Sequence, residues 1–572
     1  MKRTIINLLL AVSAVSFSLT GCIQETFPLE NKATYEQLAR SSAGIEGTLD
    51  GMIAQLYQPY YFYGDDNQLE FDISYAGLLV TYARMTNDFV NNCPTIGYDW
   101  WTGYCGSFGY VMNADNSRQT VPFMTLYKII KTANNIIGPL VSLEELNSEQ
   151  KHFLGQAYVY RALMYHDLYN MYLPAPNKYT DISAVEGLTV PIVLSGSEEE
   201  TEYKTARAPK EALSALILSD LDKAEELLAD YENESDKNPK ISVVYGLKAR
   251  MYLTLADYEN AAKFAREAID ASGKTPMTEA QWHDPKKAFC DHSGSNSWMW
   301  YYQIDPENMG NLCNPTGFLG GEADWGYNSL TQLSIHRWMY DRLNRSDFRK
   351  KSFIDPDRKK YPSSYYKWAV NKEGKAYLSK YPFDELPDYF CIKIRCKNGE
   401  WTDHKEGGAV DWPMMRVEEM YLIEAEAVGM SQGENAGIQK LESFMKQYRD
   451  PEYSYAKAAA SFGEGFVKSF QEEVLFQKRV EFLGEGVGFF DAKRIRPGMK
   501  TWYAGSNVRH DTMKYDIEEV SPYWNFVIPT REVENNDFII VQDGVSTSID
   551  GVMTTPNNPD PTGRITNVTT KY

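Results

Sequence analysis

The sequence predicts a mainly α-helical protein, built on a tetratricopeptide-like scaffold of helical repeats with long irregular loops and a few short strands. Residues 241–271 read as two amphipathic helices that meet at Asp257, with small and aromatic residues where paired helices approach closely. A related pair is expected over 413–448, and helical periodicity is clear at 122–137 and 148–169. Since one such pair cannot bury its apolar face alone, the pairs are expected to stack.

The N-terminal segment has the features of a secretory signal. Lys2 and Arg3 precede an uncharged apolar run that ends in Leu-Thr-Gly-Cys at Cys22. A positive start, a short apolar core and small residues before a cysteine are typical of a bacterial lipoprotein signal. We expect residues 1–21 to be a signal peptide with a lipobox, Cys22 to carry the lipid, and residues 22–33 to form a tether. An N-terminal membrane-anchor helix is the alternative.

Residues 34–273 are expected to form an N-terminal helical region that includes the tetratricopeptide-like repeats. One helix begins near Pro122, and a second occupies 148–169 and stops before Pro174, because proline cannot continue a helix. The second helix and a helix over 209–230 are a further candidate pair.

Residues 274–408 form a long irregular region, rich in Trp, Tyr, Pro, Gly, Asn and Asp. Irregular segments of this length inside a compact chain are usually functional, so this region is expected to face the ligand. An apparent strand from Cys391 to Cys396 would point these two side chains to opposite faces and keep them from bridging. Cys93 and Cys105 are the candidates for a local disulfide, with free buried thiols as the alternative.

Residues 409–545 are expected to form a C-terminal helical region, and 546–572 read as an exposed tail. The elements expected in the C-terminal region are the helix pair at 413–448, a helix over 466–482, and short strands at 526–529 and 538–542.

Charge and composition narrow the class of ligand. The 572 residues include 58 Lys and Arg against 78 Asp and Glu, a formal charge of -20. Nucleic acid is therefore not expected as a partner, because phosphate binding needs a basic surface. A mean hydropathy of -0.46 excludes a protein with many membrane spans. The chain contains 40 Tyr, a residue that combines a stacking face with a hydroxyl, so composition favours a binder of polar ligands.

The charged motif at 479–494 could be taken for a pair of catalytic carboxylates. Glu481 and Glu485 share one helix face at i and i+4, but arginines flank them, so a structural ion-pair network is the simpler interpretation. No Gly-x-Ser-x-Gly or His-Glu-x-x-His motif occurs in the sequence. We expect no catalytic residue, no cofactor and no metal.

Two loops contain residues that could bind a metal. The first holds His283, Asp284, Cys290 and His292, whose spacing matches no established site, so hydrogen bonds to the backbone are the simpler interpretation. The second, 65–72, is acidic and could bind calcium through oxygen atoms, but a solvated acidic turn is favoured.

Four motifs then follow one another along the chain. They are Ala157, Arg161, Ala162, Tyr165 and Leu168 with Val190 and Pro191 after them; Arg416, Glu419, Leu422, Ala425, Glu426 and Ala427; Arg479, Glu481, Phe482, Glu485, Gly486, Phe489, Asp491 and Arg494; and Ile528, Pro529, Glu532 and Asn536. With the lipobox and the repeat helices, their order from Cys22 to about residue 540 resembles the SusD and RagB family of outer-membrane nutrient-binding lipoproteins from the Bacteroidetes lineage.

The resemblance implies a protein that binds a nutrient without altering it. It would be anchored by lipid in the outer membrane, face the exterior, capture an oligosaccharide, and deliver it as a lid to a SusC-like TonB-dependent transporter. A peptide- or glycopeptide-binding lipoprotein of the same family is the first alternative. A surface glycoside hydrolase is the second and would need two carboxylates about 5 to 10 Å apart across a cleft. An assembly adaptor without a small ligand is the third.

Aromatic loops are the candidate ligand site. Sugars present apolar C–H faces edged by hydroxyls, so exposed Trp or Tyr rings beside polar side chains suit a shallow glycan site. The candidate glycan-binding residues are Trp100, Trp101, Tyr98, Trp298, Trp300 and Trp325. The resemblance favours the first cluster, because the family often places ligand-contacting aromatics before its first long helices. The alternative for each ring is a buried packing role.

Overall fold

The computed structural model describes a large part of the chain. The described residues are 35–57, 75–86, 88–90, 117–177, 182–194, 196, 204–233, 235–304, 306, 315–321, 323, 325–326, 333–358, 386–462, 466–500, 503–508, 516–517, 520–521 and 524–538. The expected signal peptide, Cys22, the candidate pair of Cys93 and Cys105, the acidic segment 65–72 and the tail lie outside them.

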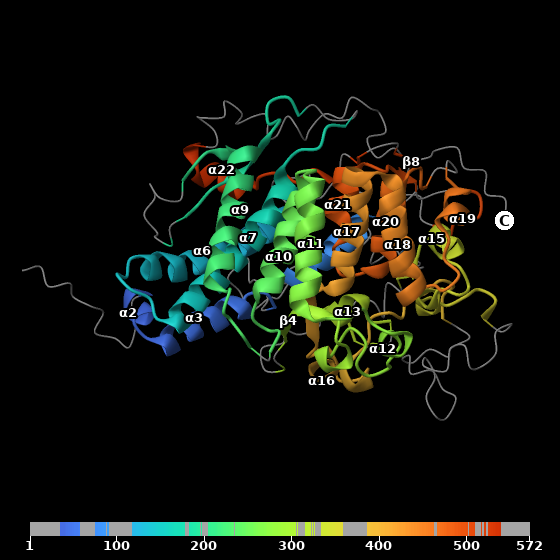
Figure 1. Cartoon of the computed structure of the whole chain (residues 1–572), viewed down its shortest axis with the longest axis horizontal. Coiled ribbons are helices and arrows are strands. Elements are labelled where there is room, and N and C mark those ends of the chain that lie inside the picture. The colour runs from blue at the N-terminus through green and yellow to red at the C-terminus, as the bar shows by residue number, and fades with distance from the viewer. Residues whose placement is uncertain are drawn as a thin grey trace, which may run out of the picture.

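A row of long helices forms the body of the molecule (Figure 1). Helix α6 (Ser117–Val141) packs on α7 (Ser148–Tyr172), α7 on α9 (Lys210–Leu227), α9 on α10 (Ile241–Thr254), and α10 on α11 (Tyr258–Ser272). The row continues from α11 to α17 (Val417–Gln432) and α18 (Glu434–Tyr448), although the whole irregular region lies between α11 and α17 in the sequence. The predicted helical-repeat scaffold is confirmed.

Local signals in the sequence fix the helix ends. Asn147 and Gln150 form a capping box at the start of α7, and the helix ends where Leu173 precedes a proline. Asp257 caps α11 by accepting the amide hydrogen of Asn260. Helix α6 begins at Ser117 rather than near Pro122, so this proline lies inside the helix and leaves one main-chain acceptor without its usual donor.

Small residues let the repeat helices approach closely. Ala249 of α10 and Ala261 and Ala265 of α11 are fully buried, and Tyr252 stacks on Phe264 with ring centroids 5.4 Å apart. The repeat pattern predicted small and aromatic residues at such close approaches, and Ala249, Tyr252, Ala261 and Ala265 are of these types.

Helices α17 and α18 cross at two glycines. A methyl group on Gly437 would lie 2.5 Å from the Cα of Gly429 and 2.6 Å from the Phe470 ring, so only glycine fits at this crossing.

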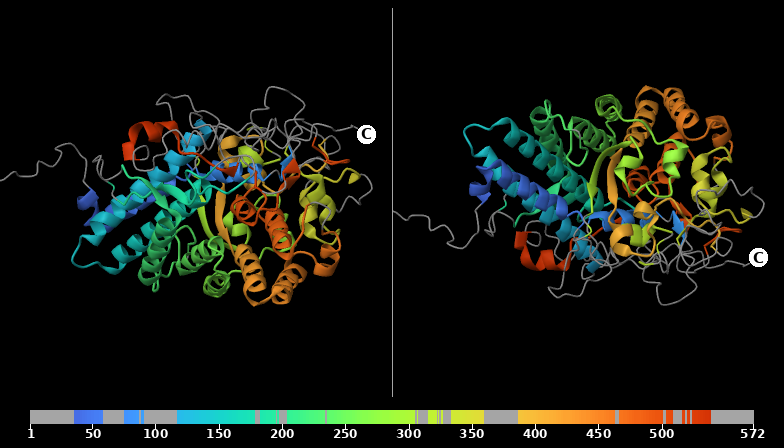
Figure 2. Two further views of the ribbon diagram at one scale, coloured as in Figure 1. Left: turned by 90° about the horizontal axis from the view of Figure 1, so that it is seen from above. Right: turned by 90° about the horizontal axis from the view of Figure 1, so that it is seen from below.

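The irregular region contributes one strand to the pair of longer strands seen among the described residues. Strand β4 (Trp298–Gln303) pairs antiparallel with β6 (Asp411–Arg416), with Trp298 opposite Arg416 and Gln303 opposite Asp411. Figure 2 shows these strands between the helices of the N-terminal half and those of the C-terminal half. The other elements of this region are α12 (Glu279–Trp282), η4 (His292–Gly294), α13 (Pro315–Leu319), β5 (Ser334–Ile335), α15 (Arg337–Arg342), η5 (Phe348–Ser352), η9 (Lys397–Gly399) and α16 (His404–Gly408).

Two predicted strands are wrong. The segment from Cys391 to Cys396 forms only an isolated bridge at Cys391, because its polar groups bind several separate loops instead of one neighbouring strand. Both cysteines are buried, and they are not joined to each other by a disulfide, as expected. Residues 526–529 are irregular, and the Phe526 amide donates to the Met171 carbonyl at the end of α7, so this segment covers a helix end. Most of the predicted strand at 538–542 lies outside the described residues.

The remaining elements surround the row of helices. They are α2 (Tyr35–Ala39), α3 (Ser42–Ala54), α4 (Tyr75–Met85), β1 (Phe89–Val90), β2 (Leu188–Pro191), β3 (Arg207–Pro209), α19 (Tyr455–Ala459), α20 (Phe470–Glu481), α21 (Gly488–Ile495), β7 (Met499–Lys500), β8 (Asp516–Ile517) and α22 (Thr530–Asn535). One hydrophobic core runs from Ala39 to Ile528 and joins the helices to β4 and β6. None of the helices in the described ranges has the length and apolar character needed to cross a bilayer.

Candidate functional site

A polar groove of about 590 Å³ lies where α3, the loop before α10, the end of β4 and the η9–α16 segment meet. These elements lie toward the lower edge of Figure 1. The volume is within the range of about 300 to 1,000 Å³ that is usual for small-molecule sites. The lining residues are Asp50, Ile53, Tyr57, Ser235, Lys237, Asn238, Tyr302, Gln303, Ile304, Pro306, Lys397, Asn398, Glu406 and Ala409.

Two tyrosine rings form the aromatic part of the groove. Tyr57, just after α3, is partly exposed and stacks on Tyr302, with ring centroids 6.1 Å apart and an interplanar angle of 18°. Tyr302 is buried in β4, so it fixes the orientation of Tyr57. A partly exposed ring backed by a buried one, with polar side chains around it, suits a ligand with an apolar face and polar edges.

The wall opposite α3 is held by main-chain contacts to β4. The indole nitrogen of Trp300 donates to the Lys237 carbonyl at 3.1 Å, and the Tyr301 amide donates to the Asp236 carbonyl at 3.1 Å. The Lys237 ammonium in turn donates to Oε1 of Gln303 at 2.7 Å. The loop before α10 is therefore fixed on the end of β4, which gives the groove a rigid edge.

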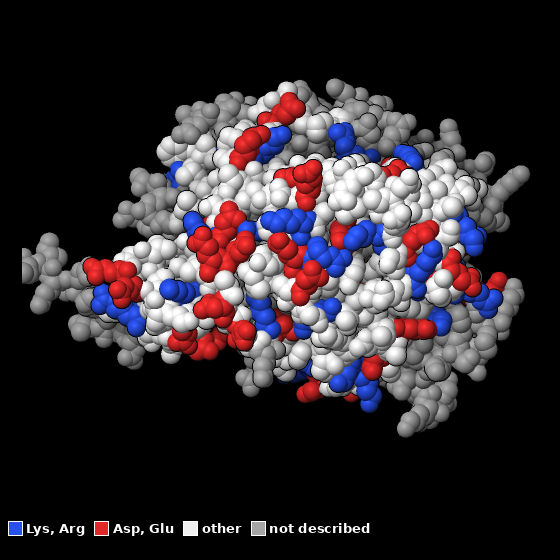
Figure 3. All heavy atoms as spheres, viewed as in Figure 1, with Lys and Arg blue, Asp and Glu red and all other residues white. Residues whose placement is uncertain are grey.

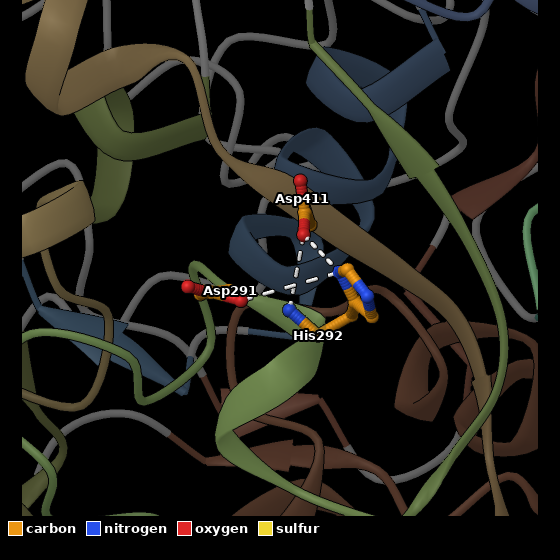
Figure 4. A group of neighbouring side chains, drawn as sticks. All are labelled: Asp291, His292 and Asp411. Atoms are coloured by element: carbon orange, nitrogen blue, oxygen red, sulfur yellow. Dashed lines mark hydrogen bonds and ion pairs between the residues drawn. The ribbon is translucent and has the colours of Figure 1, made fainter.

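Asp411 anchors the base of this wall (Figure 4). Its buried carboxylate accepts from the main-chain amide and Nδ1 of His292, at 3.1 and 2.5 Å, and from Nε2 of Gln303 at 3.0 Å. The Lys397 ammonium lies 3.4 Å from Oδ1 of Asp411, and the His292 ring stacks on Tyr301 with centroids 4.4 Å apart. A chain of polar contacts thus connects Asp411 to two groove lysines.

Asp291, His292 and Asp411 are close enough to bind one metal ion, since a ligand atom from each lies within 4.8 Å of the others. Burial raises the pKa of Asp291, but hydrogen bonds from Ser293 and the charges of Lys287 and Lys397 outweigh it, and the pKa is lowered. The Asp411 carboxylate already accepts hydrogen bonds from His292 and Gln303 and lies beside the charge of Lys397, so its oxygen atoms have partners without a metal ion. We keep the expectation of no metal as a prediction.

The other residues of this loop that could bind a metal have structural roles. The Asp284 carboxylate accepts the amide hydrogens of Lys286 and Lys287, as expected for a loop residue. Burial lowers the pKa of His283 to about 3, so its imidazole is neutral at physiological pH.

The predicted aromatic residues fall into two groups. Tyr98, Trp100 and Trp101 lie outside the described residues. Trp298, Trp300 and Trp325 are in the interior, with exposed fractions of 2%, 1% and 7%.

Burial gives the second group a packing role. Trp300 contacts Tyr160 edge to face at 5.1 Å and supports the groove wall through its indole nitrogen, and Trp325 packs with Cys396. The rings of this group are covered by protein and offer no face to a ligand in this conformation. The reason is that β4, which carries Trp298 and Trp300, runs through the core.

The charged motif forms a buried ion-pair network, as the sequence indicated. The Glu481 carboxylate accepts from Arg449 at 2.7 and 2.8 Å, from Arg416 at 3.1 Å and from Arg349 at 3.2 Å. Burial raises its pKa, but the three arginines outweigh burial and hold the pKa well below its usual range. These carboxylates are closed off from solvent, so they stabilise the fold.

Sequence reasoning did not identify the groove residues. Tyr57 follows α3, Lys237 lies in a loop, and Lys397 and Glu406 lie in the short helices η9 and α16. None of these segments has a recognisable motif. Only the tertiary contacts of β4 bring these four segments together, so no local signal could have found them.

Comparisons with known proteins agree with this fold. Residues 32–253 match a family described as "Starch-binding associating with outer membrane", and residues 286–539 match the SusD family. SusD-like protein P2 of Formosa agariphila is 22% identical over 411 residues, which cover 68% of this chain and 74% of that protein.

Solved structures share the whole architecture. A SusD-like carbohydrate binding protein from Bacteroides vulgatus has a TM-score of 0.67 at 17% identity, covering 88% of this chain and 98% of that one. Surface glycan-binding protein A from Bacteroides thetaiotaomicron, solved in complex with laminarihexaose, has a TM-score of 0.59 at 13% identity, covering 90% and 99%. With two family matches that together span residues 32–253 and 286–539, and with this shared fold, the chain belongs to the SusD family.

Proposed function

We propose that this protein captures an oligosaccharide in the groove between α3 and β4 and passes it to a SusC-like TonB-dependent transporter. The observation that carries the proposal is the partly exposed Tyr57 ring, backed by Tyr302 and edged by polar side chains, in a member of the SusD family. Surface glycan-binding protein A from Bacteroides thetaiotaomicron, which shares this fold, was solved in complex with laminarihexaose, and this supports a role in capture.

The groove suits a sugar because its polar groups are of several kinds. Carboxylates, an amide and ammonium groups surround it, so the hydroxyls of a sugar would find both hydrogen-bond donors and acceptors. Gln303, Lys397 and Glu406 come from 274–408, the region proposed to face the ligand.

The proposed site also includes Tyr98, Trp100 and Trp101. The sequence places these aromatics together before the first long helices, and residue types of this kind would extend a stacking surface. Trp300 supports the wall through its indole nitrogen, and the buried rings of Trp298, Trp300 and Trp325 are not proposed to touch the sugar.

The proposed location is the outer membrane, with the protein facing the exterior and tethered by lipid on Cys22. The family description and the lipobox support this location. In that position the helical repeats would face the transporter while the irregular loops face the ligand.

Calorimetry with a panel of plant and host oligosaccharides tests the proposal. We expect at least one glycan to bind, and Tyr57→Ala to weaken its binding by about fivefold or more, since loss of a central aromatic contact typically costs over about 1 kcal/mol. Tyr35→Ala is the matched control, because Tyr35 is exposed and does not line the groove. Binding only of peptides, or release of reducing ends from a bound glycan, would contradict the proposal.

A further inference from the structure

The charges that line the groove differ in how far they are already paired. Asp50 of α3 and Glu406 of α16 are exposed acids, whereas Lys237 and Lys397 are the basic residues. Among the residues that the structure describes, neither Asp50 nor Glu406 forms an ion pair.

Both lysines are engaged by groups behind the wall. Lys397 lies 3.4 Å from the buried carboxylate of Asp411, and its positive charge helps to lower the pKa of Asp291. The carboxylate of Asp411 therefore lies beside this ammonium group, and that of Asp291 is near enough to feel its charge. Its charge is already balanced, and an anionic ligand would have to compete with Asp411 and Asp291 for it.

Lys237 is tied to the same network through an amide. Its ammonium donates to Oε1 of Gln303, and Nε2 of Gln303 donates to Asp411. The amide is thus oriented by Asp411, with its acceptor oxygen turned to Lys237 and its donor turned away. An anion that drew the Lys237 ammonium away from the wall would leave Oε1 of Gln303 without this donor.

The remaining charge on the groove is negative. Asp50 and Glu406 come from separate elements, and both line the groove. The formal charge of -20 for the whole chain adds a long-range repulsion for anions. On the face seen in Figure 3, acidic and basic side chains are interspersed over the described residues. This face therefore has no continuous basic surface that would attract an anionic ligand.

We propose that the groove takes a neutral glycan and rejects glycans that carry uronate or sulfate, with Asp50 and Glu406 as the residues that set this preference. This inference rests on the proposed function. The hydroxyl groups of a neutral sugar can donate hydrogen bonds to these carboxylates without charge repulsion. An anionic sugar would bring its negative charge close to the same carboxylates in a partly dehydrated groove, and the repulsion would weaken its binding.

Matched pairs of ligands test the inference. The probes are a neutral glucan, galactan and mannan oligosaccharide, each beside its C6-carboxylated derivative, measured by calorimetry on the full mature chain. For the pair that binds, we expect the neutral member to bind about tenfold or more tightly than its derivative at low salt. The difference should narrow as salt is raised, because salt screens exposed charges.

A variant without the two acidic charges shows whether Asp50 and Glu406 cause the preference for neutral glycans. Asp50→Asn with Glu406→Gln keeps the size of both side chains, and we expect it to bring the derivative to within about threefold of the neutral glycan. The control Glu211→Gln with Glu259→Gln removes two acidic charges from the first turns of α9 and α11, outside the groove, and should leave the ratio unchanged.

The outcomes are distinguishable. A derivative that binds the wild-type chain as tightly as its neutral parent, or a ratio that Asp50→Asn with Glu406→Gln leaves unchanged, would overturn the inference and leave the proposed function standing. If a folded chain binds no glycan of either kind, the proposed function fails and the inference fails with it.

Discussion

Replacing Glu481 by glutamine removes one charge from a buried cluster whose charges balance. Its four basic members are Lys393, Arg349, Arg416 and Arg449, and its four acidic members are Asp347, Glu418, Glu481 and Glu485. All eight side chains are buried. Glu481 holds three of the arginines at once, so its loss leaves one positive charge uncompensated in the interior.

The structure sets the size of the expected effect. Glutamine has nearly the shape of glutamate, but its amide would point a donor at guanidinium groups that are donors themselves. Breaking a buried pair from one side costs about 3–5 kcal/mol. With an unfolding entropy of about 2.1 cal/mol/K per residue over roughly 500 residues, that corresponds to a melting temperature lower by about 3–5 °C.

The pH dependence gives a second readout. The pKa of Glu481 is held below its ordinary value of 4.5, so the unfolded chain takes up the proton more readily. Its stabilising contribution is therefore complete above about pH 5 and is lost as the pH falls through the lower, folded-state pKa. The free-energy difference between wild type and Glu481→Gln should be constant at neutral pH and shrink in acid.

Urea unfolding and calorimetry at several pH values measure this difference. Glu267→Gln is the control, since its pair with Lys263 on α11 is exposed and has a nitrogen–oxygen distance of 3.9 Å, so less than about 0.5 kcal/mol should be lost. If Glu481→Gln unfolds like the wild type, or if the difference persists unchanged in acid, then the cluster does not hold the fold together as argued.

Three further predictions concern other parts of the chain. Burial lowers the pKa of Lys493 to about 7, below its value in the unfolded chain, so the free energy of unfolding should rise with pH between 7 and about 10. Urea unfolding at pH 7 and 9.5 should show a smaller rise for Lys493→Met than for the wild type. An equal rise in both proteins would contradict a buried Lys493 with a lowered pKa. Gly437→Ala should cost about 1–3 kcal/mol, because the methyl group meets a neighbouring helix, whereas Gly138→Ala, with open space around it, should be neutral or stabilising in the same urea titration. Cys22→Ala should move the protein from the membrane fraction to the soluble fraction and abolish labelling with radioactive palmitate; retention of either property would show that Cys22 is not the anchor.

Much of the fold was determined by the sequence itself. Periodicity, the capping box at Asn147 and the small residues between 241 and 271 specified the long helices and their pairing, because helix formation depends on neighbours three or four residues apart. The charged motif around Glu481 likewise indicated an ion-pair network, but the arginines that contact Glu481 are Arg349, Arg416 and Arg449, which lie outside that motif.

Only the tertiary structure decided where the candidate site lies and which aromatic rings it can use. Trp300 and Tyr57 are both aromatic residues near polar neighbours, yet the first is buried in β4 and the second is partly exposed beside a groove. This difference depends on the pairing of β4 with β6, two segments separated by residues 304–410. Contacts between residues so far apart leave no periodic trace in the sequence, and the groove exists only where they form.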